Sequence, residues 1–173
     1  NFSIINEDEK QKKVKEKNKK KIFIITSSNK KIGYGHLTRS KTIFRQVKET
    51  YSTDVKYVFY KTKVDTKIKA FIKNEKYLIF KNVFRYFSKN DVLFIDVPFS
   101  YFLELVNILK YFKTIVIDNY SKFNKHINVI PSLTKPSKIK KQKILSGKKY
   151  LIISKDLLYE KLKNCKKKID FLF

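Results

Sequence analysis

The residues best suited to chemistry lie in one short segment, Gly33-Tyr34-Gly35-His36, with Arg39 shortly after it. Two of the chain's three glycines stand there, and glycine allows a positive φ or the close approach of a ligand. Between a buried strand and a helix, such a turn leaves helical N–H groups pointing outwards, which suits a phosphate. The segment lacks the third glycine of the dinucleotide fingerprint and the Gly-Lys-Ser/Thr of a P-loop. It predicts the binding of a phosphate-bearing sugar ligand, with a plain tight turn as the alternative.

His36 is expected in the first turn of that helix, at the edge where ligands bind. The positive end of the helix dipole favours the neutral imidazole, which can act as a base. Arg39 follows three residues later on roughly the same face and can hold a phosphate or orient a carboxylate. The alternative interpretations are a residue that merely caps the helix for His36 and a surface cation for Arg39.

Two carboxylates, Asp96 and Asp118, each end a predicted strand. Carboxylates at such positions bind sugar hydroxyls or orient a histidine, although Asp is also common in turns. His126 stands in a polar stretch and is interpreted as a surface residue, and Cys165 has no plausible partner in the sequence. No metal-ligand spacing is present, so neither a metal site nor a cofactor is expected.

These side chains need a framework of buried strands and covering helices. Short apolar runs bounded by polar turns predict strands at 22–25, 55–60, 77–80, 91–96, 114–118 and 127–130, with further extended runs at 150–153 and 168–173. Helical spacing of apolar residues predicts helices over 37–49, 66–73 and 101–111. The alternation implies parallel βαβ units, hence an α/β, Rossmann-like parallel sheet. Ligands of such sheets bind at the carboxyl ends of the strands, where the glycine turn and both carboxylates fall.

The chain is strongly basic, with 41 Lys and Arg against 15 Asp and Glu and a formal net charge of +26. Such a charge attracts nucleic acid, acidic membrane surfaces or nucleotide phosphates. However, only Arg39, Arg45 and Arg85 are arginine, and lysine is spread over nearly every segment. Proteins that read nucleic acid favour clustered charge and arginine. The pattern therefore favours the compositional bias of an AT-rich genome, and no specific nucleic acid partner is expected.

Composition also bears on location and domain organisation. No stretch reaches the ~20 apolar residues of a membrane span, no secretory signal is visible, and a single cysteine fits a reducing compartment; the cytoplasm is expected. Methionine is absent and its removal before Asn1 is not expected, which suggests a piece of a longer polypeptide. The expected division is a charged linker or tail over 1–20, a Rossmann-like N-terminal domain over 21–165 and the start of a truncated second domain over 166–173.

The segment from Ile32 to Arg39, after a strand and a Ser-Ser-containing turn, resembles a family of nucleotide-sugar hydrolases. These are the UDP-2,4-diacetamido-2,4,6-trideoxy-β-L-altropyranose hydrolases of pseudaminic acid biosynthesis, grouped with spore-coat polysaccharide biosynthesis proteins. Residues 114–119, TIVIDN, look like that family's second strand-ending acidic motif, and residues 144–152 are similar to its Leu-x-Gly-x-x-Tyr segment. The resemblance covers about residues 21–173.

The resemblance implies the N-terminal half of a two-domain fold of the GT-B glycosyltransferase type, with the active site between two Rossmann-like halves. It also implies a metal-independent reaction, in which water attacks the anomeric carbon of a UDP-sugar and UDP leaves. His36 matches the family's catalytic histidine, proposed to activate the water. The turn Gly33-Tyr34-Gly35 and Arg39 would then lie against the substrate. The strand-ending carboxylates Asp96 and Asp118 complete the set of residues expected to bind it.

The sequence departs from the family in two ways. It stops near Phe173, where the second domain, which carries most of the uridine-nucleotide contacts, would only be starting; a second domain or partner is therefore expected to complete the cleft. Asn119 also replaces an acidic residue common in the family, which weakens the case for Asp118. The alternative functions are a GT-B-type glycosyltransferase with a sugar hydroxyl as acceptor, a non-catalytic remnant or interaction domain, and a nucleic-acid binder driven by charge.

Overall fold

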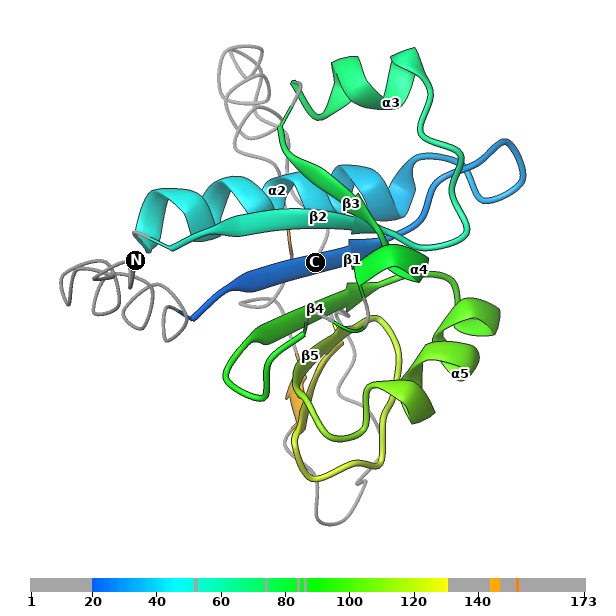
Figure 1. Ribbon diagram of the computed structural model, residues 1–173. Coiled ribbons are helices and arrows are strands. Elements are labelled where there is room, and N and C mark those ends of the chain that lie inside the picture. The colour runs from blue at the N-terminus through cyan, green and yellow to red at the C-terminus, as the bar shows by residue number, and fades with distance from the viewer. Residues whose placement is uncertain are drawn as a thin grey trace, which may run out of the picture.

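A parallel sheet runs through the middle of the protein. The computed structural model describes residues 20–51, 53–73, 75–83, 85, 87–130, 144–146 and 152. Within them, seven strands pair in the order β3-β2-β1-β4-β5-β6-β7, and every pair is parallel (Figure 1). The strands are β1 (Ile22–Thr26), β2 (Val55–Phe59), β3 (Tyr77–Ile79), β4 (Val92–Asp96), β5 (Lys113–Ile117), β6 (His126–Ile130) and β7 (Ile144–Ser146).

Helices lie on both faces of this sheet. The described helices are α2 (Gly35–Thr50), α3 (Thr66–Phe71), α4 (Phe80–Val83) and α5 (Phe99–Ile108). Figure 1 shows α2 and α5 on opposite sides of the central strands. Because helices cover both faces, the central strands are buried on both sides. Successive side chains of a strand point to opposite faces, so such strands are continuous apolar runs in the sequence rather than alternating ones.

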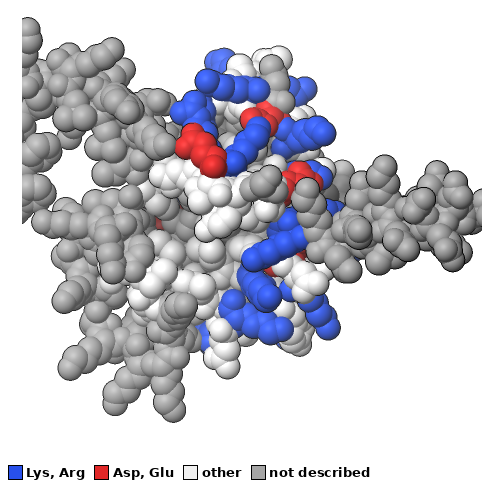
Figure 2. All heavy atoms as spheres, turned by 90° about the vertical axis from the view of Figure 1, so that its left-hand side faces the viewer, with Lys and Arg blue, Asp and Glu red and all other residues white. Residues whose placement is uncertain are grey.

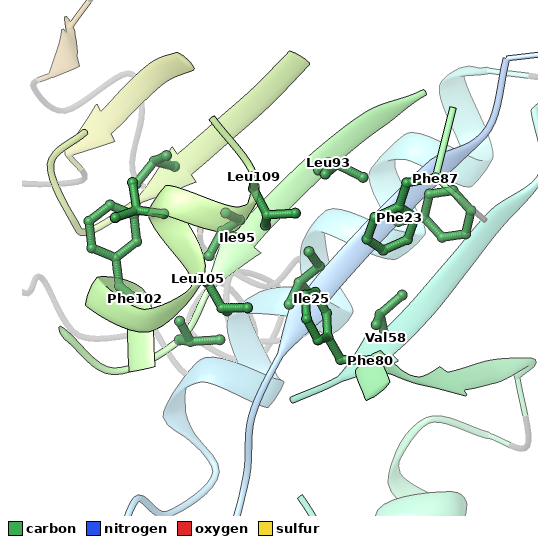
Figure 3. Close-up of a cluster of buried hydrophobic side chains, with 13 residues drawn as sticks. Phe23, Ile25, Val58, Phe80, Phe87, Leu93, Ile95, Phe102, Leu105 and Leu109 are labelled. Atoms are coloured by element: carbon green, nitrogen blue, oxygen red, sulfur yellow. The ribbon is translucent and has the colours of Figure 1, made fainter. Parts of the chain in front are cut away.

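Two hydrophobic cores result from that alternation. In β1, Phe23 and Ile25 belong to the core on the α5 side, and Ile22 and Ile24 to the core on the α2 side. Figure 3 shows the α5-side core, where side chains of α5 meet those of the central strands. The α2-side core takes its helical members from α2 and α3, namely Leu37, Ile43, Phe44, Val47 and Ile68. Both cores hold β1 and β4 at the centre of the sheet.

The strand order reverses between β1 and β4. From β1 the chain continues through α2 to β2 on one side, and from β4 it continues through α5 to β5 on the other side. In open α/β sheets, ligands bind at this reversal, outside the carboxyl ends of the two strands. The register pairs Thr26, the last residue of β1, with Asp96, the last residue of β4. Asp96 therefore lies at the position where this fold class binds its ligands.

The expected Rossmann-like sheet is confirmed, with local differences. The six strands predicted between residues 22 and 130 and the three predicted helices are present, with ends displaced by a few residues. The strand predicted to include Phe80 is wrong at that residue, which opens the short helix α4. β7 was not predicted as a strand. The runs at 150–153, apart from Ile152, and at 168–173, the charged segment 1–19 and Cys165 lie outside the described residues. The domain boundaries stay predictions.

The interpretation of His126 as a surface residue is wrong. His126 opens β6 and is only 2% exposed. Its two ring nitrogens both have partners, Nδ1 the hydroxyl of Ser121 at 2.6 Å and Nε2 the carbonyl oxygen of Leu109 at 3.2 Å. Burial of a polar ring is tolerated when its polar atoms are paired. Desolvation of the ring lowers the pKa of His126, an effect that its hydrogen bond to the Leu109 carbonyl partly opposes.

Candidate functional site

The loop between β1 and α2 is folded by its own polar groups. The side-chain oxygen of Asn29 accepts hydrogen bonds from the backbone N–H groups of Lys31 and Ile32, both at 2.9 Å. The N–H of Gly33 donates to the carbonyl oxygen of Asn29 at 2.8 Å, and the Ser28 hydroxyl donates to the Gly33 carbonyl at 3.2 Å. Gly33 has a φ of 74°, in the region that glycine tolerates best. The segment therefore forms a tight turn, and position 33 is where its backbone favours glycine.

Gly35 has a different role from Gly33. It is the first residue of α2, and its φ is not positive. A methyl group added there would meet no atom within 4 Å. The N-cap residue Tyr34 gives α2 no side-chain cap, and the first turn contains no acidic residue. The helix therefore presents an uncapped, open N-terminus, the arrangement that suits an anionic ligand group.

His36, Arg39 and Asp96 form one hydrogen-bonded cluster at the carboxyl ends of β1 and β4. Nδ1 of His36 lies 2.7 Å from Oδ1 of Asp96. Arg39 donates to both oxygens of the same carboxylate, from Nη2 to Oδ1 at 2.6 Å and from Nε to Oδ2 at 2.8 Å. The Asp96 side chain is fully buried, whereas His36 and Arg39 are 22% and 20% exposed. The cluster thus consists of a buried carboxylate and two partly exposed side chains, an imidazole and a guanidinium, that bind it.

Asp118 joins the cluster from the end of β5. Its Oδ2 accepts a hydrogen bond from Nη1 of Arg39 at 3.1 Å, and its side chain is about half exposed. Its φ of 57° places it in the left-handed region, which Asp tolerates better than most residues. Such backbone strain is often found at functional sites. The structure therefore brings together four of the residues that the sequence singled out, from three different βα units.

The charge of the cluster is dominated by its carboxylates. Burial by itself would lower the pKa of Arg39, but the hydrogen bonds and charges of Asp96, and then those of Asp118, outweigh it and raise that pKa. Arg39 is thus a permanent cation that pairs with two carboxylates. With a neutral His36, the four side chains carry a net charge of about −1, because two carboxylates face one guanidinium. Arg39 therefore neutralises protein carboxylates, which leaves less of its charge for a phosphate.

Tyr34 and Asn119 take positions that the sequence did not indicate. Tyr34 is 44% exposed, and its ring lies 6.1 Å from that of Phe71 in α3. Asn119 is buried and donates from Nδ2 to the carbonyl oxygen of Val97 at 2.9 Å. This bond ties the loop after β5 to the segment after β4, so it helps to hold Asp118 near Asp96. The amide at position 119 has this structural use, which an acidic residue without a donor would not fulfil.

Among the described residues, three buried hydroxyls on the elements that carry the cluster lack a hydrogen-bond partner. They belong to Thr26 and Ser27 at the end of β1 and to Ser40 on α2. An unpaired buried polar group costs about 1–3 kcal/mol, and violations of this kind concentrate at functional sites. Sequence reasoning missed these residues, although the polar run Thr26-Ser27-Ser28 directly after an apolar strand was the available signal.

Two cavities lie elsewhere on the sheet. One, of about 470 Å³, opens at the amino ends of β1, β4 and β5 and is lined by apolar side chains with Lys20, Lys113 and Lys125. The other, of about 610 Å³, lies at the carboxyl ends of β2 and β3 beside Tyr60 and Thr62. Neither includes a residue of the His36 cluster. The second is joined to the loop between β1 and α2, because Thr62 Oγ1 accepts a hydrogen bond from the N–H of Ser28 at 2.9 Å.

Among the described side chains that are visible in Figure 2, Lys and Arg residues are interrupted by acidic and uncharged ones. That view faces the side of Figure 1 where β1 begins, and Lys and Arg side chains stand there in separate groups with Asp and Glu among them. In the described part of the chain, no helix is long and apolar enough to cross a membrane. In the same residues, no group of three or more His, Cys, Asp or Glu side chains is placed to hold a metal ion.

No family model, curated protein or solved structure matches this chain. The likeness to nucleotide-sugar hydrolases therefore rests on the sequence motifs alone. The site itself rests on the geometry described above.

Proposed function

We propose that this chain is the N-terminal half of a UDP-sugar hydrolase, acting in nonulosonic (pseudaminic) acid biosynthesis as its motifs suggest. The observation that carries the proposal is the position of His36. It stands in the first turn of α2 at the strand-order reversal, with Nδ1 held 2.7 Å from a buried carboxylate. A histidine oriented in this way by a carboxylate is the arrangement of a general base.

In the proposed reaction, His36 takes a proton from a water molecule as its oxygen attacks the anomeric carbon. A bond forms between that oxygen and the carbon, and the bond from the carbon to the diphosphate oxygen breaks. UDP leaves with the electron pair of the broken bond. Catalysis would arise from the positioned water, from the base and from donors that stabilise the departing diphosphate.

The charge of the cluster indicates where the diphosphate would lie. Because Arg39 is engaged by Asp96 and Asp118, it is poorly placed to neutralise a diphosphate. The open N-terminus of α2, with Gly35 at its start, is the better placed anion-binding element of the described residues. Further contacts to UDP would come from a second domain or a partner, as the resemblance implies. Asp118, half exposed, remains available to accept a hydrogen bond from a sugar hydroxyl.

The experiment is UDP release by the complete protein and its His36→Ala variant, with a UDP-linked diacetamido-trideoxyhexose as substrate. We expect turnover to fall by about 10²–10⁴-fold, the usual contribution of a general base. Lys48→Ala is the matched control, because Lys48 stands in the last turn of the same helix and is well exposed. Near-normal turnover by His36→Ala would contradict the proposal. Detection of a glycoside instead of the free sugar would identify a glycosyltransferase.

A further inference from the structure

The carboxylate of Asp96 is not accessible to a substrate in this structure. Its side chain is fully buried, and both oxygens are occupied within the protein. Oδ1 lies within hydrogen-bond distance of His36 Nδ1 and accepts a hydrogen bond from Arg39 Nη2, and Oδ2 accepts one from Arg39 Nε. A substrate hydroxyl would have to displace one of these bonds in a water-excluded position. The geometry therefore gives Asp96 a role that acts through its neighbours.

The protonation of His36 follows from that of Asp96. Arg39 binds both carboxylate oxygens, a pairing that holds a buried carboxylate in its ionised form. An ionised carboxylate only accepts hydrogen bonds, so the proton between it and His36 must be on Nδ1. The 3.4 Å contact between Arg39 Nη2 and His36 Nδ1 then joins two donors and is not a hydrogen bond. In the neutral ring, Nε2 consequently carries the lone pair.

We infer that Asp96 is a positioning residue, which fixes His36 as the Nδ1–H tautomer and makes Nε2 the atom that accepts the proton from water. Arg39 fixes the position of the Asp96 carboxylate through two hydrogen bonds and balances its charge. This inference rests on the proposed function only for the identity of the proton donor. The tautomer itself follows from the distances and is testable without a substrate.

The second histidine provides an internal reference of the opposite kind. His126 Nε2 lies 3.2 Å from the carbonyl oxygen of Leu109, which can only accept, so Nε2 carries the proton. Nδ1 of His126 then accepts from the Ser121 hydroxyl at 2.6 Å. The chain has only these two histidines. The structure thus predicts one ring in each tautomeric form within the same molecule.

The experiment uses this chain labelled with ¹⁵N-histidine, observed by two- and three-bond ¹H–¹⁵N correlation at pH 8, where a histidine of ordinary pKa is neutral. The expected wild-type spectrum has one ring with a protonated Nδ1 and one with a protonated Nε2. His126→Gln assigns them, because the signals it leaves belong to His36. Two rings that both carry the proton on Nε2 would overturn the inference, and no variant of the cluster is needed to reach that result.

Asp96→Asn then tests the cause. An amide can donate to Nδ1, so the proton of His36 should move to Nε2, and Nε2 would lose its lone pair. The control is Asp118→Asn, which contacts Arg39 but not His36 and should leave the tautomer unchanged. A His36 that keeps its Nδ1 proton in Asp96→Asn, with unfolding curves showing a folded protein, refutes the assignment. If Asp96→Asn does not fold, the wild-type spectrum alone decides.

A kinetic measurement on the complete protein separates this inference from the proposed function. If both hold, Asp96→Asn lowers kcat of UDP release by about 10²–10⁴-fold and changes KM little, because the base and not the ligand contact is lost. If the wild type releases no UDP but shows the expected tautomers, the proposed function fails and the positioning role stands. If the wild type is active and Asp96→Asn raises KM without lowering kcat, Asp96 binds substrate and the positioning role fails.

Discussion

Replacement of Arg39 by methionine tests whether the cluster is held by its buried ion pair. Methionine keeps much of the length of the side chain but removes every donor. It leaves the fully buried carboxylate of Asp96 with His36 as its one remaining partner from the cluster. Removal of one member of a buried pair costs about 3–5 kcal/mol, because the other charge stays buried without compensation. The variant should therefore lose a large part of a total stability of about 5–15 kcal/mol.

The hydrogen bonds give a consistent magnitude. Arg39 makes two bonds to Asp96, at 2.6 and 2.8 Å, and each bond to a charged group contributes about 1.5–3 kcal/mol. Its third bond, at 3.1 Å to the half-exposed Asp118, adds less, because water screens that pair. Asp118→Asn should accordingly cost at most about 1 kcal/mol. The difference between the two variants measures how much of the cluster's stability depends on burial.

The assay is urea unfolding at pH 7, followed by circular dichroism, with Lys48→Ala as the reference for an exposed pair. Lys48 and Glu75 lie 2.7 Å apart and are both solvent-accessible, so that variant should lose no more than about 1 kcal/mol. Arg39→Lys restores the charge without the fork of donors and should recover only part of the loss. An Arg39→Met protein as stable as Lys48→Ala would show that the carboxylate is neutral or hydrated, and would refute the reasoning from buried charge.

Two further predictions concern the site loop and the second histidine. Gly33→Ala should lower the free energy of unfolding by about 1 kcal/mol or more, because φ is 74° there. Gly35→Ala, in open space at the start of α2, should be neutral or slightly stabilising. Thermal melts of both variants check this, and equal losses of stability would contradict it. Because burial lowers the folded-state pKa of His126 below its ordinary value of 6.5, the unfolded chain binds the proton first, and this contribution to stability declines as the pH falls below about 6.5. Urea titrations between pH 8 and 5 should show this decline, up to about 1.4 kcal/mol per pH unit, in the wild type but not in His126→Gln; parallel curves would exclude it.

The location of the candidate site could be predicted from the sequence because its residues mark the ends of strands and the start of a helix. Glycines are rare in this chain, so Gly33 and Gly35 between an apolar run and an amphipathic run marked a strand, a turn and a helix. Carboxylates that end apolar runs, such as Asp96, necessarily reach the carboxyl edge of a parallel sheet. The placement of these residues at the edge of the sheet therefore followed from patterns within single segments, and the fold class followed from the alternation of strands and helices along the chain.

The connections between these residues were not predictable in the same way. Asp96 is 60 residues from His36 in sequence, and their contact depends on β4 pairing beside β1 rather than at the edge of the sheet. The sequence left open whether Arg39 holds a phosphate, orients a carboxylate or is a surface cation, and the fold places it on two carboxylates. His126 was misjudged for a similar reason, since its polar partners come from a loop and a helix end that only the fold assembles.

The arrangement favours chemistry at His36 over a purely structural use of the cluster. A cluster that served stability alone would gain little from an imidazole, because Arg39 already satisfies both oxygens of Asp96, and apolar residues of equal volume are often as stable as a buried ion pair. Instead, the carboxylate has His36 as a second partner, and the other ring nitrogen, Nε2, makes no hydrogen bond among the described residues on a side chain that is 22% exposed. This ring stands in the first turn of an uncapped helix, beside unpaired hydroxyls and a strained Asp118. Unpaired buried hydroxyls and a positive φ cost folding free energy, and such departures from the rules of stability concentrate at functional sites. Together with a partly exposed imidazole, they support the proposal that His36 moves a proton.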